Sequence, residues 1–116
     1  MAKFFAYKLV WSGTLSAGGT VTSDTAKWTA DDKYIIEKIF IIERDARTLS
    51  DVEVTAAIDD YVFTKDKVPA SVFAPDELLS PVLNLVIDKG KNVKFDLKNV
   101  GSNDYNIYIV LKLLKE

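Results

Sequence analysis

Two pairs of neighbouring aspartates, Asp31-Asp32 and Asp59-Asp60, are the side chains with the clearest potential for chemistry. Carboxylates brought together from two loops could bind Ca²⁺, a hard cation that takes several oxygen ligands. The Asp-x-Asp-x-Asp-Gly spacing of a dedicated calcium loop is absent, however, and aspartate favours turns because its side chain bonds the nearby backbone. We therefore expect Asp31, Asp32, Asp59 and Asp60 to shape turns at strand ends, with calcium binding as the alternative.

The residue types that the chain lacks limit its chemistry further. It contains no histidine and no cysteine, the side chains used most for acid–base catalysis at neutral pH, thiol chemistry, disulfides and zinc-thiolate sites. Paired carboxylates alone can cleave glycosidic bonds, but nothing in the sequence indicates the cleft that this reaction needs. We expect a non-catalytic protein without a cofactor, and a small carboxylate enzyme is the weaker alternative.

Basic and aromatic side chains supply the remaining binding candidates. Lysines cluster around Phe95 in residues 89–98, but strand alternation turns Phe95 away from Lys94. The formal net charge of -2 gives no general attraction to nucleic acid, so we do not expect a nucleic-acid partner. Trp28 lies in a polar segment and is the aromatic residue that we expect to be most exposed, which makes a glycan an alternative ligand.

The elements that must position these residues alternate with a period of two, which is typical of β-strands. The clearest predicted strands cover residues 4–11, 33–43, 51–58, 92–98 and 105–114. The second and the last of these are apolar on both faces, so we expect both in the middle of a sheet, covered twice or facing a neighbouring subunit. No long helix of the kind that joins parallel strands is apparent. We therefore predict one all-β domain spanning residues 1–116.

A long crossover decides between the β architectures. Residues 64–82 contain all three prolines, and residues 75–80 within them are predicted to form one short helical turn, because proline and acidic residues favour a helix start. A connection of this length suits a chain that leaves one sheet and joins another. The predicted fold is an antiparallel two-sheet sandwich, with a jelly roll favoured over an immunoglobulin-like sandwich.

Alternation also predicts which side chains share a face. In the first strand, one face is predicted to carry Phe5, Tyr7, Leu9 and Trp11, which indicates that Trp11 packs in the core. In the strand at 33–43, one face is predicted to carry Ile35, Ile39 and Ile41, and the other Ile36, Phe40 and Ile42.

Large apolar side chains gather at both ends of the chain, where isolated domains usually fray. Apolar side chains in such places, and an exposed tryptophan, are typical of a contact with another molecule. The predicted interface residues are Phe4, Phe5, Trp11, Trp28, Leu113 and Leu114.

Four segments carry a resemblance to a known family. They are the Ser16–Thr22 opening, the isoleucine-rich strand at 33–43, the Pro75–Pro81 crossover, and the Asp88–Lys91 turn that leads into Asn92–Lys98. Their order resembles that of small single-jelly-roll virion proteins, which include capsid, minor capsid and capsid-decorating proteins. The resemblance implies a structural protein without catalytic residues, whose partners are copies of itself or other capsid proteins.

The chain ends bear on localisation. Lys8 interrupts the apolar run near the N-terminus, so no signal peptide is predicted, and no stretch is long enough to span a membrane. Together with the resemblance, this predicts a virion protein made in the host cytoplasm. The competing hypothesis is a carbohydrate-binding, lectin-like β-sandwich module, which depends on Trp28.

Overall fold

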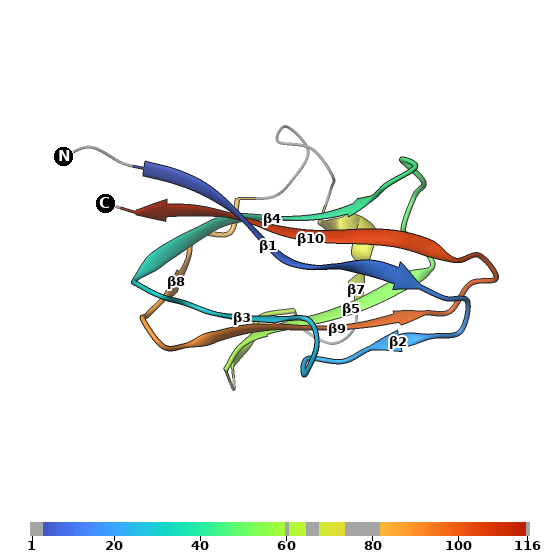
Figure 1. The fold of residues 1–116 in the computed structure, drawn as a ribbon, viewed down its shortest axis with the longest axis horizontal. Helices are drawn as coiled ribbons and strands as arrows, with labels where there is room; N and C mark the ends of the chain where they lie inside the picture. The colour runs from blue at the N-terminus through green and yellow to red at the C-terminus, as the bar shows by residue number, and fades with distance from the viewer. Residues whose placement is uncertain (1–3, 60, 65–67, 74–81, 116) are drawn as a thin grey trace.

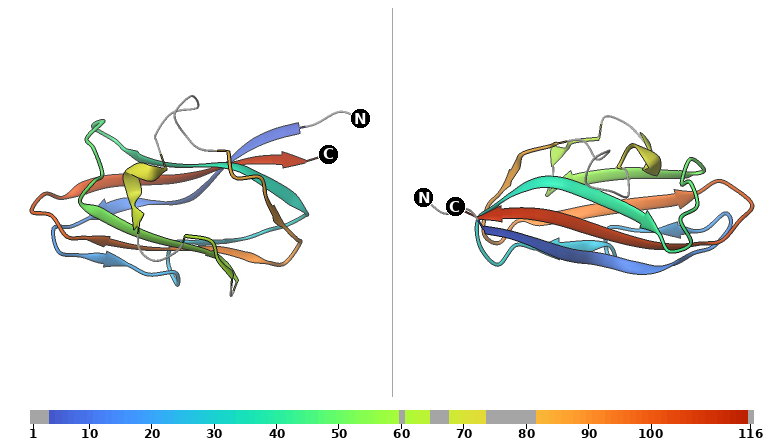
Figure 2. Two further views of the ribbon diagram at one scale, coloured as in Figure 1. Left: turned by 180° about the vertical axis from the view of Figure 1, so that it is seen from behind. Right: turned by 90° about the horizontal axis from the view of Figure 1, so that it is seen from above.

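The computed structural model describes residues 4–59, 61–64, 68–73 and 82–115, and these form two antiparallel β-sheets packed face to face (Figure 1). Sheet A consists, in spatial order, of β1 (Phe4–Leu15), β10 (Tyr105–Lys115), β4 (Tyr34–Glu43) and β8 (Leu85–Ile87). Seen from above, β4, β10 and β1 run side by side, with β1 at the edge, and the start of β1 lies at the same end as the end of β10 (Figure 2).

Sheet B is built from shorter strands. Its main path is β2 (Thr20–Val21), β9 (Asn92–Asn99), β5 (Val52–Ile58) and β6 (Tyr61–Val62). Two further strands lie off this path: β3 (Lys27–Thr29) pairs with β9, and β7 (Val68–Pro69) pairs with β5. A 3-10 turn, η1 (Ala70–Val72), follows β7 directly.

The strand order is that of a jelly roll. β2 and β3 pair with opposite ends of β9, and β6 and β7 pair with opposite ends of β5, so each pair acts as one interrupted strand. With each such pair counted as one strand and the strands numbered along the chain, sheet A holds, in spatial order, the first, last, third and sixth strands. Sheet B holds the second, seventh, fourth and fifth, and this arrangement is the jelly-roll order. The predicted two-sheet sandwich is confirmed. The predicted helical turn at 75–80 lies outside the described residues.

The core lies between the two sheets and follows the predicted alternation in two long strands. The buried side chains of β10 are Tyr105, Ile107, Ile109, Leu111 and Leu113, and those of β9 include Val93, Phe95 and Leu97. Each fully buried aliphatic or aromatic side chain contributes about 1.5–3 kcal/mol relative to exposure. β10 and β4 are the two central strands of sheet A, as their apolar character on both faces predicts.

The first strand departs from simple alternation because its pairing with β10 contains an irregularity. Leu9 lies opposite Val110 and Trp11 lies opposite Ile109, which leaves Val10 as an extra residue. One extra residue in a strand exchanges the two faces from that point onward. Before Val10, the even-numbered residues of β1 therefore point to the core. After Val10, the odd-numbered residues do.

This exchange corrects one prediction. Phe5, Tyr7 and Leu9 point away from sheet B and are exposed, whereas Trp11 points inward and packs against the core. The indole ring lies so close to Gly13 that a Cβ atom there would approach it to 2.8 Å. The prediction that Trp11 shares a face with Tyr7 and Leu9 is wrong, although Trp11 does contact the core.

β4 contains a second irregularity, because Lys112 lies opposite Lys38 and the next residue, Leu113, lies opposite Ile36. Glu37 is therefore an extra residue in the pairing with β10. As a result Ile36 lies on the inner face with Ile39 and Ile41, and all three are buried. Ile35 lies on the outer face instead. The predicted grouping of Ile35 with Ile39 and Ile41 is therefore wrong, for the same reason as in β1.

Candidate functional site

The side of sheet A that faces away from sheet B is a broad apolar surface, called outer face A below. Its exposed apolar side chains are Phe5, Tyr7 and Leu9 of β1, Tyr108 of β10 and Val86 of β8. With about 200 Å² for each fully exposed large side chain, these five residues expose roughly 500 Å² together. Monomeric proteins rarely carry much larger apolar patches, and patches of this size are often functional.

The strand register makes outer face A continuous across the sheet. Residues directly opposite each other on neighbouring antiparallel strands have adjacent side chains. The rows across the sheet are Phe5, Leu114, Ile35 and Val86; then Tyr7, Lys112 and Lys38; then Leu9, Val110 and Phe40; and finally Tyr108 and Ile42. Only the second row carries charge, so a largely apolar partner fits this surface.

The charged row is neutralised in part by the chain itself. The Lys112 Nζ atom lies 3.2 Å from a carboxylate oxygen of Glu37, and it sits 4.7 Å from the centre of the Phe5 ring. Lys38 is 8% exposed. Lysine stems can cover apolar surface while the ammonium group keeps a polar or aromatic partner. The lysines therefore interrupt outer face A without forming a strongly positive patch.

The predicted interface residues at the chain ends have different positions. Phe5 is exposed on outer face A, and Phe4 begins β1, where its pairing is described but its side chain is not. Leu113 is buried in the core, and Leu114 is 7% exposed on the outer side between Phe5 and Ile35. The other exposed residues of outer face A, Tyr7, Leu9, Tyr108 and Val86, were not among the predicted interface residues.

Trp28 is less accessible than the glycan hypothesis requires. It is half-buried and packs against the core. Its ring lies 5.8 Å from the ring of Tyr34, and the two planes are inclined by 45°. The two rings therefore do not form one continuous flat platform.

The first aspartate pair binds groups of its own chain. Asp31 accepts a hydrogen bond from the Tyr34 hydroxyl at 2.9 Å. Asp32 accepts one from the backbone N–H of Lys33 at 2.7 Å, and it forms an ion pair with Lys115. The contact with Lys115 lowers the pKa of Asp32. These bonds fasten the turn before β4 to the end of β10.

The second pair is described only in part, because Asp60 lies outside the described residues. Asp59 adopts a positive φ of 49° and accepts a hydrogen bond from the backbone N–H of Asn92 at 3.0 Å. Its other carboxylate oxygen lies 3.6 Å from the Lys91 ammonium group. Within the described ranges, no group of three or more acidic, histidine or cysteine side chains is arranged to hold a metal ion.

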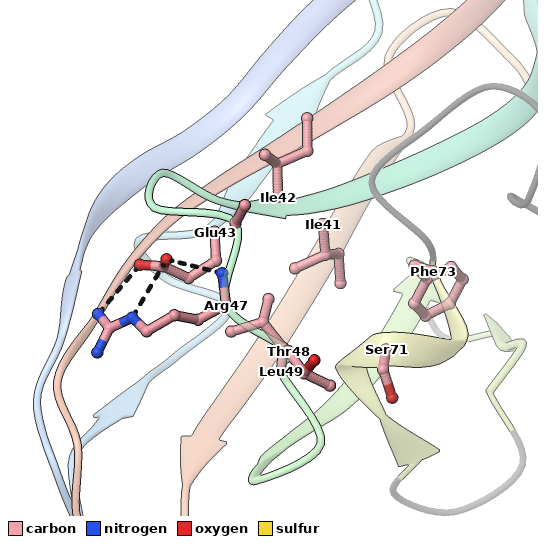
Figure 3. Close-up of a pocket in the computed structure, with 9 residues that line it drawn as sticks. Ile41, Ile42, Glu43, Arg47, Thr48, Leu49, Ser71 and Phe73 are labelled. Carbon is pink, nitrogen blue, oxygen red and sulfur yellow. Dashed lines mark hydrogen bonds and ion pairs between the residues drawn. The ribbon is translucent and has the colours of Figure 1, made fainter.

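A pocket of about 240 Å³ opens where β4 ends and the chain crosses from sheet A to sheet B (Figure 3). It is lined by Ile41, Ile42, Glu43, Ala46, Arg47, Thr48, Leu49, Ser71 and Phe73. Most of these side chains are apolar, and the polar pair Glu43 and Arg47 lies at one side, joined by hydrogen bonds (Figure 3).

Glu43 has a completely buried side chain in this cluster. Burial would raise the pKa of Glu43, but hydrogen bonds from the Arg47 side chain and from the backbone N–H groups of Asn106, Asp45 and Arg47 outweigh it and lower the pKa to about 2. Arg47 also donates to the carbonyl oxygen of Asp104 at 2.6 Å. Because the carboxylate stays ionised and its oxygens are occupied, it holds the crossover in place and is unsuited to proton donation.

Comparisons with known proteins identify no relative: no family model, no curated protein and no solved structure matches the chain. In the part of the chain that the structure describes, no helix has the length and apolar character needed to cross a membrane. The candidate site therefore rests on geometry alone, and outer face A is its most extensive feature.

Proposed function

We propose that the protein is a non-catalytic structural protein that works by associating with copies of itself through outer face A, as a capsid or capsid-decorating protein of a virus-like particle. The observation that carries the proposal is the row of exposed apolar side chains that β1 presents on this face. A soluble monomer gains nothing from such a surface, whereas a subunit that buries it on assembly gains about 25 cal/mol for each Å².

Two further features support this role. The strand order is a jelly roll, an architecture that viral capsid proteins use. The polar clusters of the described residues, at Asp32, Glu43 and Asp59, are all occupied by donors from the same chain. They act in holding turns, which leaves outer face A as the feature without a structural purpose inside one subunit.

Light scattering of the purified chain over a wide concentration range tests the proposal. We expect the apparent mass to rise above that of the monomer as concentration increases, and to fall again on dilution. A protein that remains monomeric at every concentration would contradict the proposal. Quenching of tryptophan fluorescence by members of a glycan panel would instead favour the lectin-like hypothesis.

A further inference from the structure

The first half of β1 is an open sheet edge. β1 pairs with β10 on one side, and no described strand pairs with its other side. The segment 5–9 is also exposed on both faces, because Ala6 and Lys8 on the inner face are exposed like their neighbours on the outer face. A long, exposed edge with apolar side chains offers unpaired backbone groups to another strand.

We propose that the β1 edge is the site at which two copies of this chain meet, with the two β1 strands antiparallel and a two-fold axis passing through Tyr7. The two four-stranded sheets A then form one continuous eight-stranded sheet. This inference rests on the proposed function and deepens it, because it names the contacting segment and its register.

The sequence of β1 is complementary to itself in this register. Pairing about Tyr7 sets the two copies of Tyr7 opposite each other, and sets Phe5 of each copy opposite Leu9 of the other. Cross-strand pairs of aromatic and aliphatic side chains contribute roughly 0.2–1 kcal/mol each. On the opposite face, Lys8 of each copy meets Ala6 of the other, so no like charges are opposed.

Neighbouring registers are less favourable. An axis through Lys8 would place two ammonium groups directly opposite each other, which is destabilising. An axis through Ala6 would carry Leu9 beyond the start of the partner's β1 at Phe4 and so lose an apolar contact. The extra residue Val10 twists the strand beyond this segment and limits the pairing to its first half.

The size of the contact predicts a reversible dimer. Phe5, Tyr7 and Leu9 are 56%, 62% and 47% exposed, which corresponds to roughly 330 Å² of side chain for each copy, and edge pairing covers only the part of this area that faces the partner strand. A stable interface typically buries about 800 Å² on each partner. The dimer is therefore expected to depend on concentration, as suits a subunit that gains stability from several contacts in an assembly.

Disulfide trapping in the full chain tests the register. The chain has no cysteine, so Tyr7→Cys introduces a single thiol, which lies on the proposed axis and within bridging distance of its copy. Tyr61→Cys is the matched control, because Tyr61 is 65% exposed but lies on β6 of sheet B. Under mild oxidation we expect Tyr7→Cys to form covalent dimer at least tenfold faster than Tyr61→Cys, as read on non-reducing gels.

Each other outcome overturns a defined part of the account. If light scattering shows oligomers but Tyr7→Cys reacts no faster than Tyr61→Cys, pairing at the β1 edge is wrong and the proposed function stands. Faster trapping with Ala6→Cys or Lys8→Cys than with Tyr7→Cys would overturn this register. A monomer that forms no covalent dimer would contradict both proposals. Circular dichroism of each variant confirms that it is folded.

A charge exchange provides a second test that does not need oxidation. In the proposed register, a mixture of Phe5→Glu and Leu9→Lys chains opposes the introduced carboxylate of one copy to the introduced ammonium group of the other. Native mass spectrometry of an equimolar mixture should then show the mixed dimer well above the share expected from random pairing. A statistical mixture of the three dimers would contradict the proposed register.

Discussion

The outer faces of the two sheets differ sharply, although both sheets enclose the same core. On sheet B, the outward positions of β5 and β9 are mostly polar: Glu53 lies opposite Lys98, Thr55 lies opposite Asp96, and Ala57 lies opposite Lys94. On sheet A, the corresponding positions form outer face A. Sheet B has exposed apolar side chains at Tyr61 and Val62, but these lie at its β6 edge and not across the face.

This difference shows which residues the fold requires and which it leaves open. Inward positions of both sheets must be apolar, because they form one shared core. Outward positions are not constrained in this way, and sheet B fills most of them with polar or charged side chains, which include the opposed charges of Glu53 and Lys98. The apolar outward positions of sheet A are the positions that the proposed self-association would bury.

The largest expected effect concerns Glu43, which secures the crossover from one sheet to the other. Glu43→Gln should lower the free energy of unfolding by about 3 kcal/mol, because a neutral amide cannot accept hydrogen bonds from all the N–H donors that surround the buried carboxylate. Urea denaturation measures this loss. Arg44→Ala is the control: Arg44 forms an exposed ion pair with Asp45 at 3.8 Å, so its loss should cost no more than about 0.5 kcal/mol. Equal effects would show that the cluster does not hold the crossover.

The same carboxylate predicts a dependence of stability on acid pH. The folded pKa of Glu43 is about 2, below its ordinary value of 4.5, so its ionisation stabilises the folded state above pH 4.5. That contribution, up to about 3 kcal/mol, is lost as the pH falls from 4.5 towards 2. Unfolding free energies measured across this range should decline less steeply in Glu43→Gln. Parallel curves for the two proteins would be inconsistent with the assigned role.

An intermediate effect tests the exchange of faces in β1. Gly13→Ala should destabilise the protein by about 2 kcal/mol, because the new methyl group would press on the Trp11 ring. The cost should shrink when Trp11→Leu is already present, which a double-mutant cycle in urea measures. An unchanged cost in the double variant would mean that Trp11 does not lie over Gly13.

The smallest effect concerns the hydrated face of sheet B. Glu53→Lys would oppose two positive charges, at positions 53 and 98, and should cost about 0.5 kcal/mol. Light scattering should show no change in self-association. A loss of association equal to that caused by substitutions on outer face A would remove the proposed distinction between the faces.

Much of the fold could be predicted from the sequence. Alternation located β5, β9 and β10, and their inward residues are buried as expected, except that Ile58 of β5 is only partly buried. The two irregularities could not be predicted. In β1 the odd positions 9, 11, 13 and 15 are Leu, Trp, Gly and Leu, so the pattern continues unbroken through the extra residue and gives no local sign of it.

The candidate site was harder to predict than the fold. Phe5 was identified, but Tyr7 and Leu9 were assigned to a buried face by simple alternation. The Glu43 cluster was missed, because it draws on Asn106, which lies far along the chain. Contacts of this kind depend on strand register, which a single sequence specifies only once the topology is known.

The most direct test of the central claim compares one charge placed on each outer face. Tyr7→Lys and Thr55→Lys each introduce one ammonium group at an outward position, on sheet A and sheet B respectively. Sedimentation equilibrium should show self-association weakened about 30-fold or more by Tyr7→Lys, as expected for a central interface residue worth about 2 kcal/mol. Thr55→Lys should associate like the unmodified protein. Equal association constants for both variants would contradict the claim that outer face A mediates assembly.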